Sequence, residues 1–408
     1  MQDTPKGNRL HIAIFGRRNA GKSSLINALT HQDLAVVSPV PGTTTDPVYK
    51  AMEILPIGPV MIIDTAGIDD EGDLGALRVE KTMQVLNKAD LVLLVVDATG
   101  DLSVYEERIV AECKQKQLAV LGVANKADLM LPSQESMQSW SDRLNIPFWP
   151  TSAASGEGIE VLKTQIIQQA PENWESIPVI GDLLNPGETV VLVVPIDLAA
   201  PKGRLILPQV QTIRDILDHD ATCVVVKERE LKEALQNMQQ PPKLVVTDSQ
   251  EFLKVAADTP PEVLLTSFSI LFARHKGDLE TFVKGVKAID TLKPGDKVLI
   301  AEGCTHHRQA DDIGKVKIPR WLRQFVGGEL VFEWVSGGTF PRDVSTYQLI
   351  VHCGSCMLNR REVLSRLAGA REQEIPIVNY GILIAHVHGI LHRALAPFPL
   401  AQMILEEY

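Results

Sequence analysis

Cysteine and histidine residues follow two short apolar runs in the last third of the chain. The run KVLIA is followed closely by Cys304, and the run YQLIV leads into His352, Cys353 and Cys356. Apolar, β-branched runs of this length predict buried strands, and parallel strands place ligand sites at their carboxyl ends. If the two strands are neighbours, three thiols meet at one edge of a sheet.

Three thiolates with nearby imidazoles suit an iron–sulfur cluster, whose irons take cysteine sulfur and sometimes histidine nitrogen. A CxxC pair also occurs in redox sites, and a structural zinc would need a fourth closed ligand, which His306 or His352 could supply. The residues favour a cluster over zinc. Cluster ligands are expected at Cys304, Cys353 and Cys356, and the fourth ligand stays open among His306, His307, His352 and Asp311.

A phosphate-binding loop lies near the start of the chain. The apolar run His11–Phe15 leads into GRRNAGKS and then into the helical pattern SSLINALT, so strand, loop and helix follow in the required order. Lys22 would place its charge near the β- and γ-phosphates, and the Ser23 hydroxyl would ligate Mg²⁺. The nucleotide contacts expected here are Gly16, Asn19, Ala20, Gly21, Lys22, Ser23 and Ser24.

Later motifs indicate that the nucleotide is GTP. In DTAG, Asp64 would reach Mg²⁺ through water, and the Gly67 amide would sense the γ-phosphate. In NKAD, the Asp128 carboxylate can accept two hydrogen bonds from guanine, which adenine cannot offer. The remaining expected base contacts are Asn125, Lys126, Ser152 and Ala153.

The run PGTTTD lies where a first switch belongs, and its Thr44 is the candidate second Mg²⁺ ligand. With GRRNAGKSS and DTAG, this run resembles the translation-factor-like GTPases of the tRNA-modification and ribosome-assembly group. That resemblance implies a possible potassium ion held by Asn19. Ile68 stands where Ras-like proteins carry a water-orienting glutamine, so we expect slow hydrolysis that serves as a switch. Lys22, Thr44, Asp64 and Gly67 are the expected catalytic residues.

Length and composition limit the classes of protein. The chain has 408 residues, a net charge of −11 and five cysteines, which favours a protein of two or three domains without a disulfide framework. The acidic balance argues against nucleic acid or an anionic membrane as a partner. With no apolar run of transmembrane length and no signal-peptide core, the prediction is a cytoplasmic protein. Cys113 and Cys223 are interpreted as core residues.

Alternating strand and helix patterns predict an α/β chain of three parts. A GTP-binding domain is expected over 1–173, a middle α/β domain over 174–267 and a cluster-binding domain over 268–408. The strands expected in 189–267 are apolar, and an exposed edge of their sheet would have to be covered by another segment. A second copy of the chain could cover it, which predicts a homodimer formed through these residues. Gly381–Leu395 predicts a single closing helix.

The pairing of GRRNAGKS, DTAG and NKAD with CTH and HCGSC resembles the maturation GTPases of [FeFe]-hydrogenase, along the whole chain. The resemblance implies a [4Fe–4S] cluster, dimerisation through the middle domain and a diiron H-cluster precursor as cargo. That precursor would come from radical-SAM maturases and pass to apo-[FeFe]-hydrogenase. Arginines that flank the motifs and could steady an anionic cargo are Arg308, Arg320 and Arg360.

A second class of function is a GTP-dependent assembly factor for RNA or ribosomes with a structural zinc in the C-terminal domain. The acidic composition and the absence of a recognisable KH or RRM pattern count against it.

Overall fold

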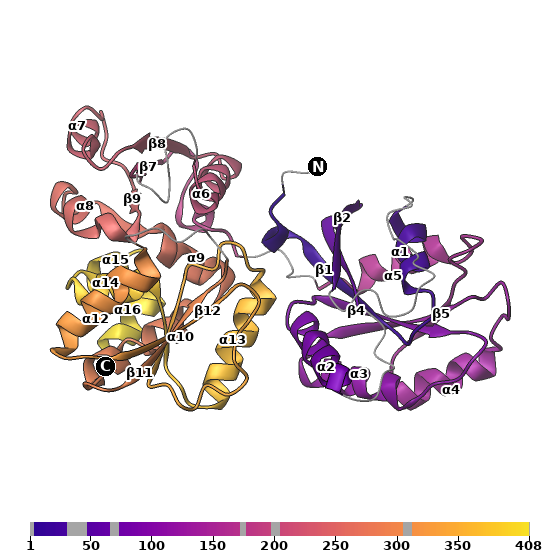
Figure 1. Cartoon of the computed structure of the whole chain (residues 1–408). Coiled ribbons are helices and arrows are strands. Elements are labelled where there is room, and N and C mark those ends of the chain that lie inside the picture. Colours follow the sequence, from indigo (N-terminus) through magenta and orange to yellow (C-terminus); the bar gives the residue numbers. More distant parts are fainter. Residues whose placement is uncertain are drawn as a thin grey trace. The chain divides into compact units, whose positions relative to one another are not determined.

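The structure is a computed structural model that describes residues 4–30, 47–65, 73–171, 177–196, 205–304 and 312–407, without the side chains of 73–79. It divides into two compact units, Met1–Glu175 and Ser176–Tyr408 (Figure 1). Several predicted site residues lie outside the described residues: Thr44, Gly67, His306, His307, Arg308 and Asp311. None of the described helices is long and apolar enough to cross a membrane.

The first unit is built on a six-stranded sheet in the order β2-β3-β1-β4-β5-β6, in which only β2 is antiparallel to its neighbour. The strands are β1 Leu10–Phe15, β2 Val48–Ile54, β3 Gly58–Asp64, β4 Leu91–Asp97, β5 Ala119–Asn125 and β6 Phe148–Pro150. The helices are α1 Lys22–Thr30, α2 Asp73–Leu86, α3 Val104–Gln115, α4 Gln134–Leu144 and α5 Ile159–Gln169.

Helices cover both faces of this sheet. Alternate residues of β1 belong to two different cores, one with α1 and α5 and the other with α2, α3 and α4. This explains why β4 reads LVLLVV without polar alternation, since a central parallel strand is buried on both sides. Cys113 of α3 is fully buried in the second of these cores, as predicted.

The second unit contains two parallel four-stranded sheets. The middle sheet has the order β10-β9-β7-β8 and the C-terminal sheet the order β12-β11-β13-β14. Middle-sheet elements are β7 Thr189–Val193, α6 Leu207–Asp218, β8 Thr222–Val226, α7 Leu231–Gln236, β9 Leu244–Thr247, α8 Phe252–Asp258 and β10 Leu264–Ser267. Among the described elements β8 is an edge strand, and its Val225 is 44% exposed while Cys223 is half-buried.

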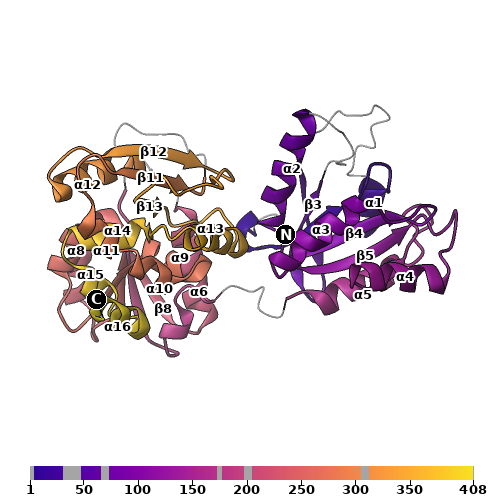
Figure 2. The same ribbon diagram turned by 90° about the horizontal axis from the view of Figure 1, so that it is seen from below.

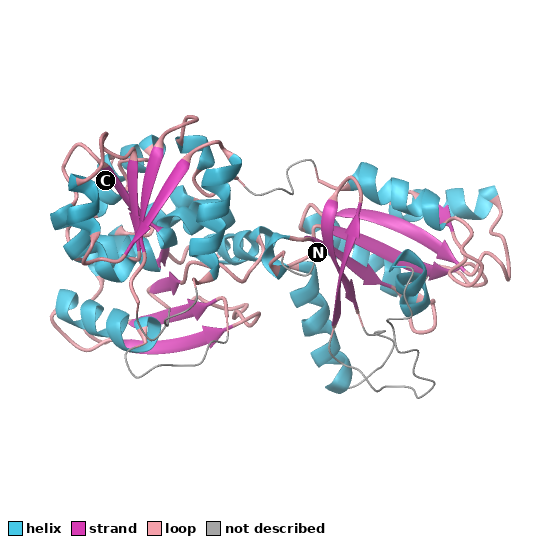
Figure 3. Cartoon of the chain, turned by 90° about the horizontal axis from the view of Figure 1, so that it is seen from above, coloured by secondary structure: helices cyan, strands magenta, loops and turns pink. Residues whose placement is uncertain are grey.

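The C-terminal sheet follows three helices, α9 Phe268–Lys276, α10 Leu279–Lys284 and α11 Lys287–Thr291. Its strands are β11 Lys297–Glu302, β12 Val331–Ser336, β13 Leu349–His352 and β14 Ile377–Asn379, and Figure 2 shows β11, β12 and β13 side by side. Its further helices are α12 Ile318–Val326, α13 Arg360–Glu372, α14 Tyr380–Val387, α15 Leu391–Ala394 and α16 Pro399–Glu406. Figure 3 shows the helices packed around the strands of each unit.

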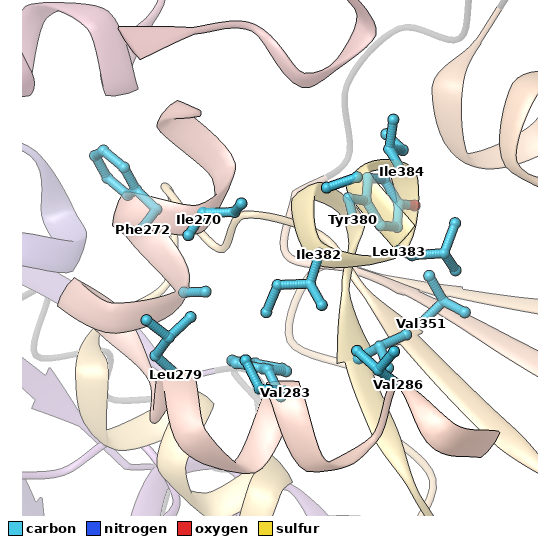
Figure 4. Close-up of a cluster of buried hydrophobic side chains, with 14 of the residues drawn as sticks. Ile270, Phe272, Leu279, Val283, Val286, Val351, Tyr380, Ile382, Leu383 and Ile384 are labelled. Atoms are coloured by element: carbon cyan, nitrogen blue, oxygen red, sulfur yellow. The ribbon is translucent and has the colours of Figure 1, made fainter. Parts of the chain in front are cut away.

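Helix α9 lies in the core that the two sheets share. Ser267 caps its first turn by accepting a hydrogen bond from the Ile270 amide, and the helix is buried almost all round. Figure 4 shows Ile270 and Phe272 of this helix among buried residues of α10, β13 and α14. The same cluster includes Val190 and Leu192 of the middle sheet. The predicted boundary between residues 267 and 268 therefore falls between β10 and α9, inside one continuous core.

The predicted single helix over Gly381–Leu395 is wrong. Helix α14 ends at Val387, and Gly389 has a φ of 71°. That left-handed conformation ends a helix and is favourable for glycine, so the chain turns before α15 begins at Leu391.

Candidate functional site

The segments that carry the three C-terminal cysteines leave adjacent strands at one edge of the sheet. Strand β11 pairs in parallel with β13, with Ala301 opposite His352. The Cys353 amide continues the ladder by donating to the Ala301 carbonyl at 3.0 Å. Cys304 follows the end of β11, so both cysteines emerge from the same edge, as the sequence predicted.

The Cys353 sulfur accepts two backbone hydrogen bonds. The Gly303 amide donates to it at 3.0 Å and the Ser355 amide at 3.4 Å. Burial raises the pKa of the Cys353 thiol, and these two donors oppose the rise because they favour the thiolate. Ser355 has a φ of 59°, a left-handed conformation that turns the chain between the two cysteines of CxxC.

Cys356 lies within electrostatic reach of the other two thiols. Its pKa is raised to about 12, first by burial and then by Cys353 and Cys304, while the buried cation of Lys276 acts in the opposite direction. These are partly buried thiols, two of which disfavour ionisation of the third, and a thiolate-binding metal cluster would neutralise the charge that ionisation creates. The side chains present therefore fit an iron–sulfur cluster in donor type and in backbone support.

Within the residues that the structure describes, no three His, Cys, Asp or Glu side chains are grouped as ligands of a single metal ion. Three of the candidate fourth ligands, His306, His307 and Asp311, fall in 305–311, outside those residues. The fourth ligand thus stays a prediction.

His352 is buried and hydrogen-bonded on both ring nitrogens. Its Nε2 lies 3.1 Å from Arg366 Nη1, and its Nδ1 lies 3.0 Å from the Cys353 carbonyl and 3.1 Å from the Ser355 hydroxyl. Arginine only donates, so Nε2 accepts and Nδ1 carries the proton. Burial, followed by the Arg366 charge, lowers the pKa of His352 to about 3, which keeps the ring neutral. In this geometry His352 supports the CxxC turn through hydrogen bonds.

Arg366 links that histidine to helix α13. Its Nη2 donates to Glu362 Oε1 at 2.8 Å and to the Gly337 carbonyl at 2.6 Å, and its guanidinium lies 5.3 Å from the Phe340 ring centre. Both members of the Arg366–Glu362 pair are nearly fully buried. This pair was not predicted from the sequence, although an arginine four residues after a glutamate on a helix is a visible signal.

The Arg360 side chain lies against the end of helix α9. Its Nη1 donates to the carbonyls of Arg274, His275 and Gly277 at 3.2, 3.0 and 2.8 Å. These carbonyls lie at the carboxyl end of α9, where helices have unpaired acceptors and favour cations. Arg360 therefore caps α9. Arg320 is exposed on α12.

The nucleotide site in the first unit lies between β1 and α1. Lys22 Nζ donates to the carbonyls of Gly16 and Arg17 at 2.7 and 2.9 Å and so spans the loop. Gly21 has a φ of 88°, and a Cβ there would lie 2.2 Å from Asn125 Nδ2. The loop therefore requires glycine both for its backbone conformation and for close packing.

The predicted Mg²⁺ residues meet at one end of this loop. Ser23 Oγ donates to Asp64 Oδ2 at 2.9 Å. Burial raises the pKa of Asp64, while the Ser23 hydrogen bond and the charges of Lys22 and Lys50 oppose that rise. A hydroxyl and a carboxylate at hydrogen-bonding distance form an oxygen site of the kind that Mg²⁺ prefers.

The predicted guanine-binding residues are also assembled. Asn125 Nδ2 donates to the Ala20 carbonyl at 2.9 Å, and its Oδ1 accepts from the Ala153 amide at 3.1 Å. Ser152 Oγ donates to Asp128 Oδ1 at 2.6 Å. These bonds tie the base-binding segments to the phosphate loop.

Two further contacts of this site were not predicted. Lys126 Nζ donates to Asp97 Oδ2 at 2.6 Å, and Arg17 Nε donates to Glu106 Oε1 at 2.9 Å. Glu106 is fully buried and also accepts from Ser103 in a capping box of α3. The signal was the run SVYE, which has the capping-box spacing.

The fold and the nucleotide site define a P-loop GTPase. The model of the 50S ribosome-binding GTPase family matches residues 11–126. The tRNA modification GTPase MnmE of Aquifex aeolicus is 36% identical over 165 residues, which are 40% of this chain and 35% of that protein. MnmE of Koribacter versatilis is 39% identical over 160 residues, which are 39% of this chain and 34% of that protein. The chain thus spans about a third of the length of these relatives.

The remaining part of the chain identifies the family. The hydrogen maturase F dimerization domain matches residues 179–277 and the hydrogen maturase F tetramerization domain matches 280–397. Together they cover more than half of the 408 residues. The chain belongs to the hydrogen maturase F family, a HydF-type hydrogenase maturase GTPase, as its motifs predicted.

Solved structures resemble the chain only weakly. A crystal structure of Aquifex aeolicus Era with GDP and AlF4⁻ is 21% identical and has a TM-score of 0.37, covering 61% of this chain and 99% of that one. The G domain of the T. maritima FeoB iron transporter is 24% identical with a TM-score of 0.32, covering 40% and 99%. Likeness at this level does not extend to function.

Proposed function

We propose that the chain is a GTPase scaffold that binds a [4Fe–4S] cluster and assembles and delivers the diiron subcluster of the H-cluster to apo-[FeFe]-hydrogenase. The observation that carries this proposal is the convergence of Cys304, Cys353 and Cys356 at the ends of adjacent strands in a chain of the hydrogen maturase F family. The alternative of an RNA or ribosome assembly factor with structural zinc has no such support.

The three cysteines would hold three irons, and the fourth position would take a weaker ligand. A [4Fe–4S] cluster supplies an iron with an exchangeable position, at which a diiron cargo could dock through one of its own ligands. The chain contributes the thiolates, the amides of Gly303 and Ser355 at Cys353, and the buried His352–Arg366 support. His306, His307, His352 and Asp311 remain the candidate residues for the fourth position.

In the first unit, GTP would be hydrolysed slowly. Ser23 and Thr44 would ligate Mg²⁺, Asp64 would reach it through water, and the Gly67 amide would sense the γ-phosphate. Asp128 would select guanine. A potassium ion near Asn19, which has a φ of 62° in the loop, would stand in for an arginine finger. If exchange of K⁺ for Na⁺ leaves the rate of hydrolysis unchanged, the potassium assignment is wrong.

Assembly and partners follow from the family. We propose a homodimer through the middle domain, 174–267, and further association through the C-terminal domain, which match the dimerization and tetramerization models. The proposed partners are radical-SAM hydrogenase maturases and apo-[FeFe]-hydrogenase, in the cytoplasm, with no nucleic acid and no membrane. The full chain should sediment as a dimer or larger species at micromolar concentration, and a strict monomer would contradict this.

The test of the cluster is metal analysis with an ultraviolet–visible spectrum of anaerobically purified protein. We expect about four irons per chain and broad absorption near 400 nm, as thiolate-bound clusters give. One zinc per chain without visible absorption would contradict the cluster and favour the alternative function. Pulsed EPR of the reduced cluster with added imidazole or cyanide then tests the exchangeable position, because a closed site would respond to neither ligand.

A further inference from the structure

A lysine occupies an inward position on strand β2 of the GTPase unit. Along this strand Lys50, Met52 and Ile54 are turned inward, whereas their neighbours Tyr49 and Glu53 are exposed. Met52 and Ile54 belong to the core that α1 covers. Lysine is among the residues least often buried, so a lysine on the inward face of this strand is unusual and indicates a function.

The strand register directs Lys50 toward the metal end of the nucleotide site. Strand β2 pairs antiparallel with β3, with Lys50 opposite Ile62 and Val48 opposite Asp64. Lys50 and Asp64 are therefore diagonal neighbours on one face, at a separation that a lysine side chain spans. Asp64 is the carboxylate that accepts the hydrogen bond from Ser23 at 2.9 Å.

The ammonium of Lys50 lacks a hydrogen-bond partner within the part of the chain that the structure describes. Its Nζ is shielded from solvent and has no hydrogen-bond partner among the described residues. Burial lowers the pKa of Lys50, and the Asp64 charge opposes that change. Among the described residues, the Lys50 cation is thus held near Asp64 by charge alone, whereas Lys22 donates hydrogen bonds to two loop carbonyls.

We propose that Lys50 is a built-in counter-ion of Asp64 that competes with Mg²⁺ and so loosens the bound nucleotide. In the metal-free site its charge balances the carboxylate. When Mg²⁺ arrives beside Ser23 and Asp64, the ammonium repels it and lowers its affinity. Because Mg²⁺ bridges protein and phosphates in P-loop GTPases, a weaker metal means faster exchange of GDP for GTP. This inference rests on the proposed binding of GTP with Mg²⁺ and is independent of the cluster.

The test is a titration of Mg²⁺ against a fluorescent GDP analogue bound to the full chain. For Lys50→Met we expect the Mg²⁺ concentration at half-maximal retention of nucleotide to fall about tenfold, as one charge opposing a divalent ion in a hydrated site predicts. Release of the analogue at limiting Mg²⁺ should slow by a similar factor. Lys50→Arg keeps the charge and should behave as the unaltered chain does.

Lys163→Met is the matched control, since it removes the same charge from a lysine that pairs with Glu160 on α5 and belongs to neither the Mg²⁺ nor the nucleotide residues. If Lys50→Met does not fold, Lys50→Gln serves in its place. An unchanged Mg²⁺ requirement overturns the inference. A raised requirement also overturns it, because Lys50 would then hold phosphate. If the unaltered chain binds no guanine nucleotide, the proposed GTP site itself is wrong.

Discussion

The two candidate sites of this chain use different kinds of binding group. At the nucleotide site the binding groups are largely backbone, shaped by Gly21 and spanned by Lys22, whose ammonium is fixed to the carbonyls of two loop residues. At the cysteine site the binding groups are side chains from two strand ends, held by hydrogen bonds to Cys353 and by the buried His352–Arg366 contact. A backbone site depends on local sequence, and a side-chain site depends on distant packing.

The two sites also differ in what must change when a ligand arrives. The first unit already presents cations to an anionic ligand. The second presents thiols whose pKa values are raised by burial, so a metal must displace their protons before it binds. We therefore expect the nucleotide site to fill rapidly and the cysteine site to depend on pH and on a metal donor.

The largest expected effect is complete loss of the cluster in Cys353→Ala. This sulfur accepts hydrogen bonds from two backbone amides where the strand ends meet. Iron content and absorption near 400 nm should fall to background, while GTP hydrolysis stays within about twofold because the two sites lie in separate units. Cys223→Ala on β8 is the control and should keep the cluster. Full iron in Cys353→Ala would refute the assignment.

Lys22→Ala should weaken GTP binding by about a thousandfold, or about 4 kcal/mol, within the range for removing one partner of a buried, hydrogen-bonded charge pair. Lys22 spans the loop at 2.7 and 2.9 Å, so its loss also frees the backbone that must receive the phosphates. Calorimetric titration with a non-hydrolysable GTP analogue measures the effect. Iron content should not change. Binding within tenfold of the unaltered chain would show that the backbone alone suffices.

Arg366→Met should lower the free energy of unfolding of the second unit by about 3 kcal/mol, since it leaves Glu362 buried without its cation. Two unfolding transitions are expected in urea, and the transition of the second unit is recognised because added GDP does not shift its midpoint. Arg371→Met removes a mostly exposed arginine from the same helix and should change little. If Arg366→Met keeps both stability and iron, side-chain packing does not hold the cysteine turn.

The smallest expected effect is a pH dependence from His275. Burial lowers the pKa of His275 to about 4, below its ordinary 6.5, so the unfolded chain binds the proton more readily. Its contribution to stability is complete above pH 6.5 and declines as pH falls, by about 1.4 kcal/mol at pH 5.5. The difference between the urea midpoints at pH 7.5 and pH 5.5 should be smaller for His275→Asn than for the unaltered chain. The exposed His392→Gln should leave the dependence intact, and a His275→Asn variant with an undiminished slope would contradict the assignment.

Motifs predicted most of the first unit because their chemistry is local. The loop GRRNAGKS sits between β1 and α1, and Asn125 with Ser152 and Asp128 forms the expected base-binding set. The strand ends that bring Cys304 near Cys353 were also predictable, since apolar runs fix the strands and parallel pairing fixes the edge.

The residues that pair across the fold were not predictable. Periodicity identifies the inward face of β2 but not that the lysine there lies beside Asp64. The same limit applies to the contact of His352 with Arg366 and to the contacts of Arg360 with the end of α9. The helix break at Gly389 was missed because a single glycine inside an apolar pattern is often tolerated.

Residues near the C-terminal end of the second unit form hydrogen bonds with residues that come much earlier in the chain. Arg393 donates to the carbonyls of Ala256 and Thr259, 137 and 134 residues earlier, and the Gly381 amide donates to Ser269, 112 residues earlier. Contacts this distant form only after nearly the whole chain has left the ribosome. The GTPase unit can fold during translation, before these contacts of the second unit have formed. A newly made chain therefore has its nucleotide domain in place before the second unit closes around its cysteines, and the proposed cluster site is completed later than the GTP site.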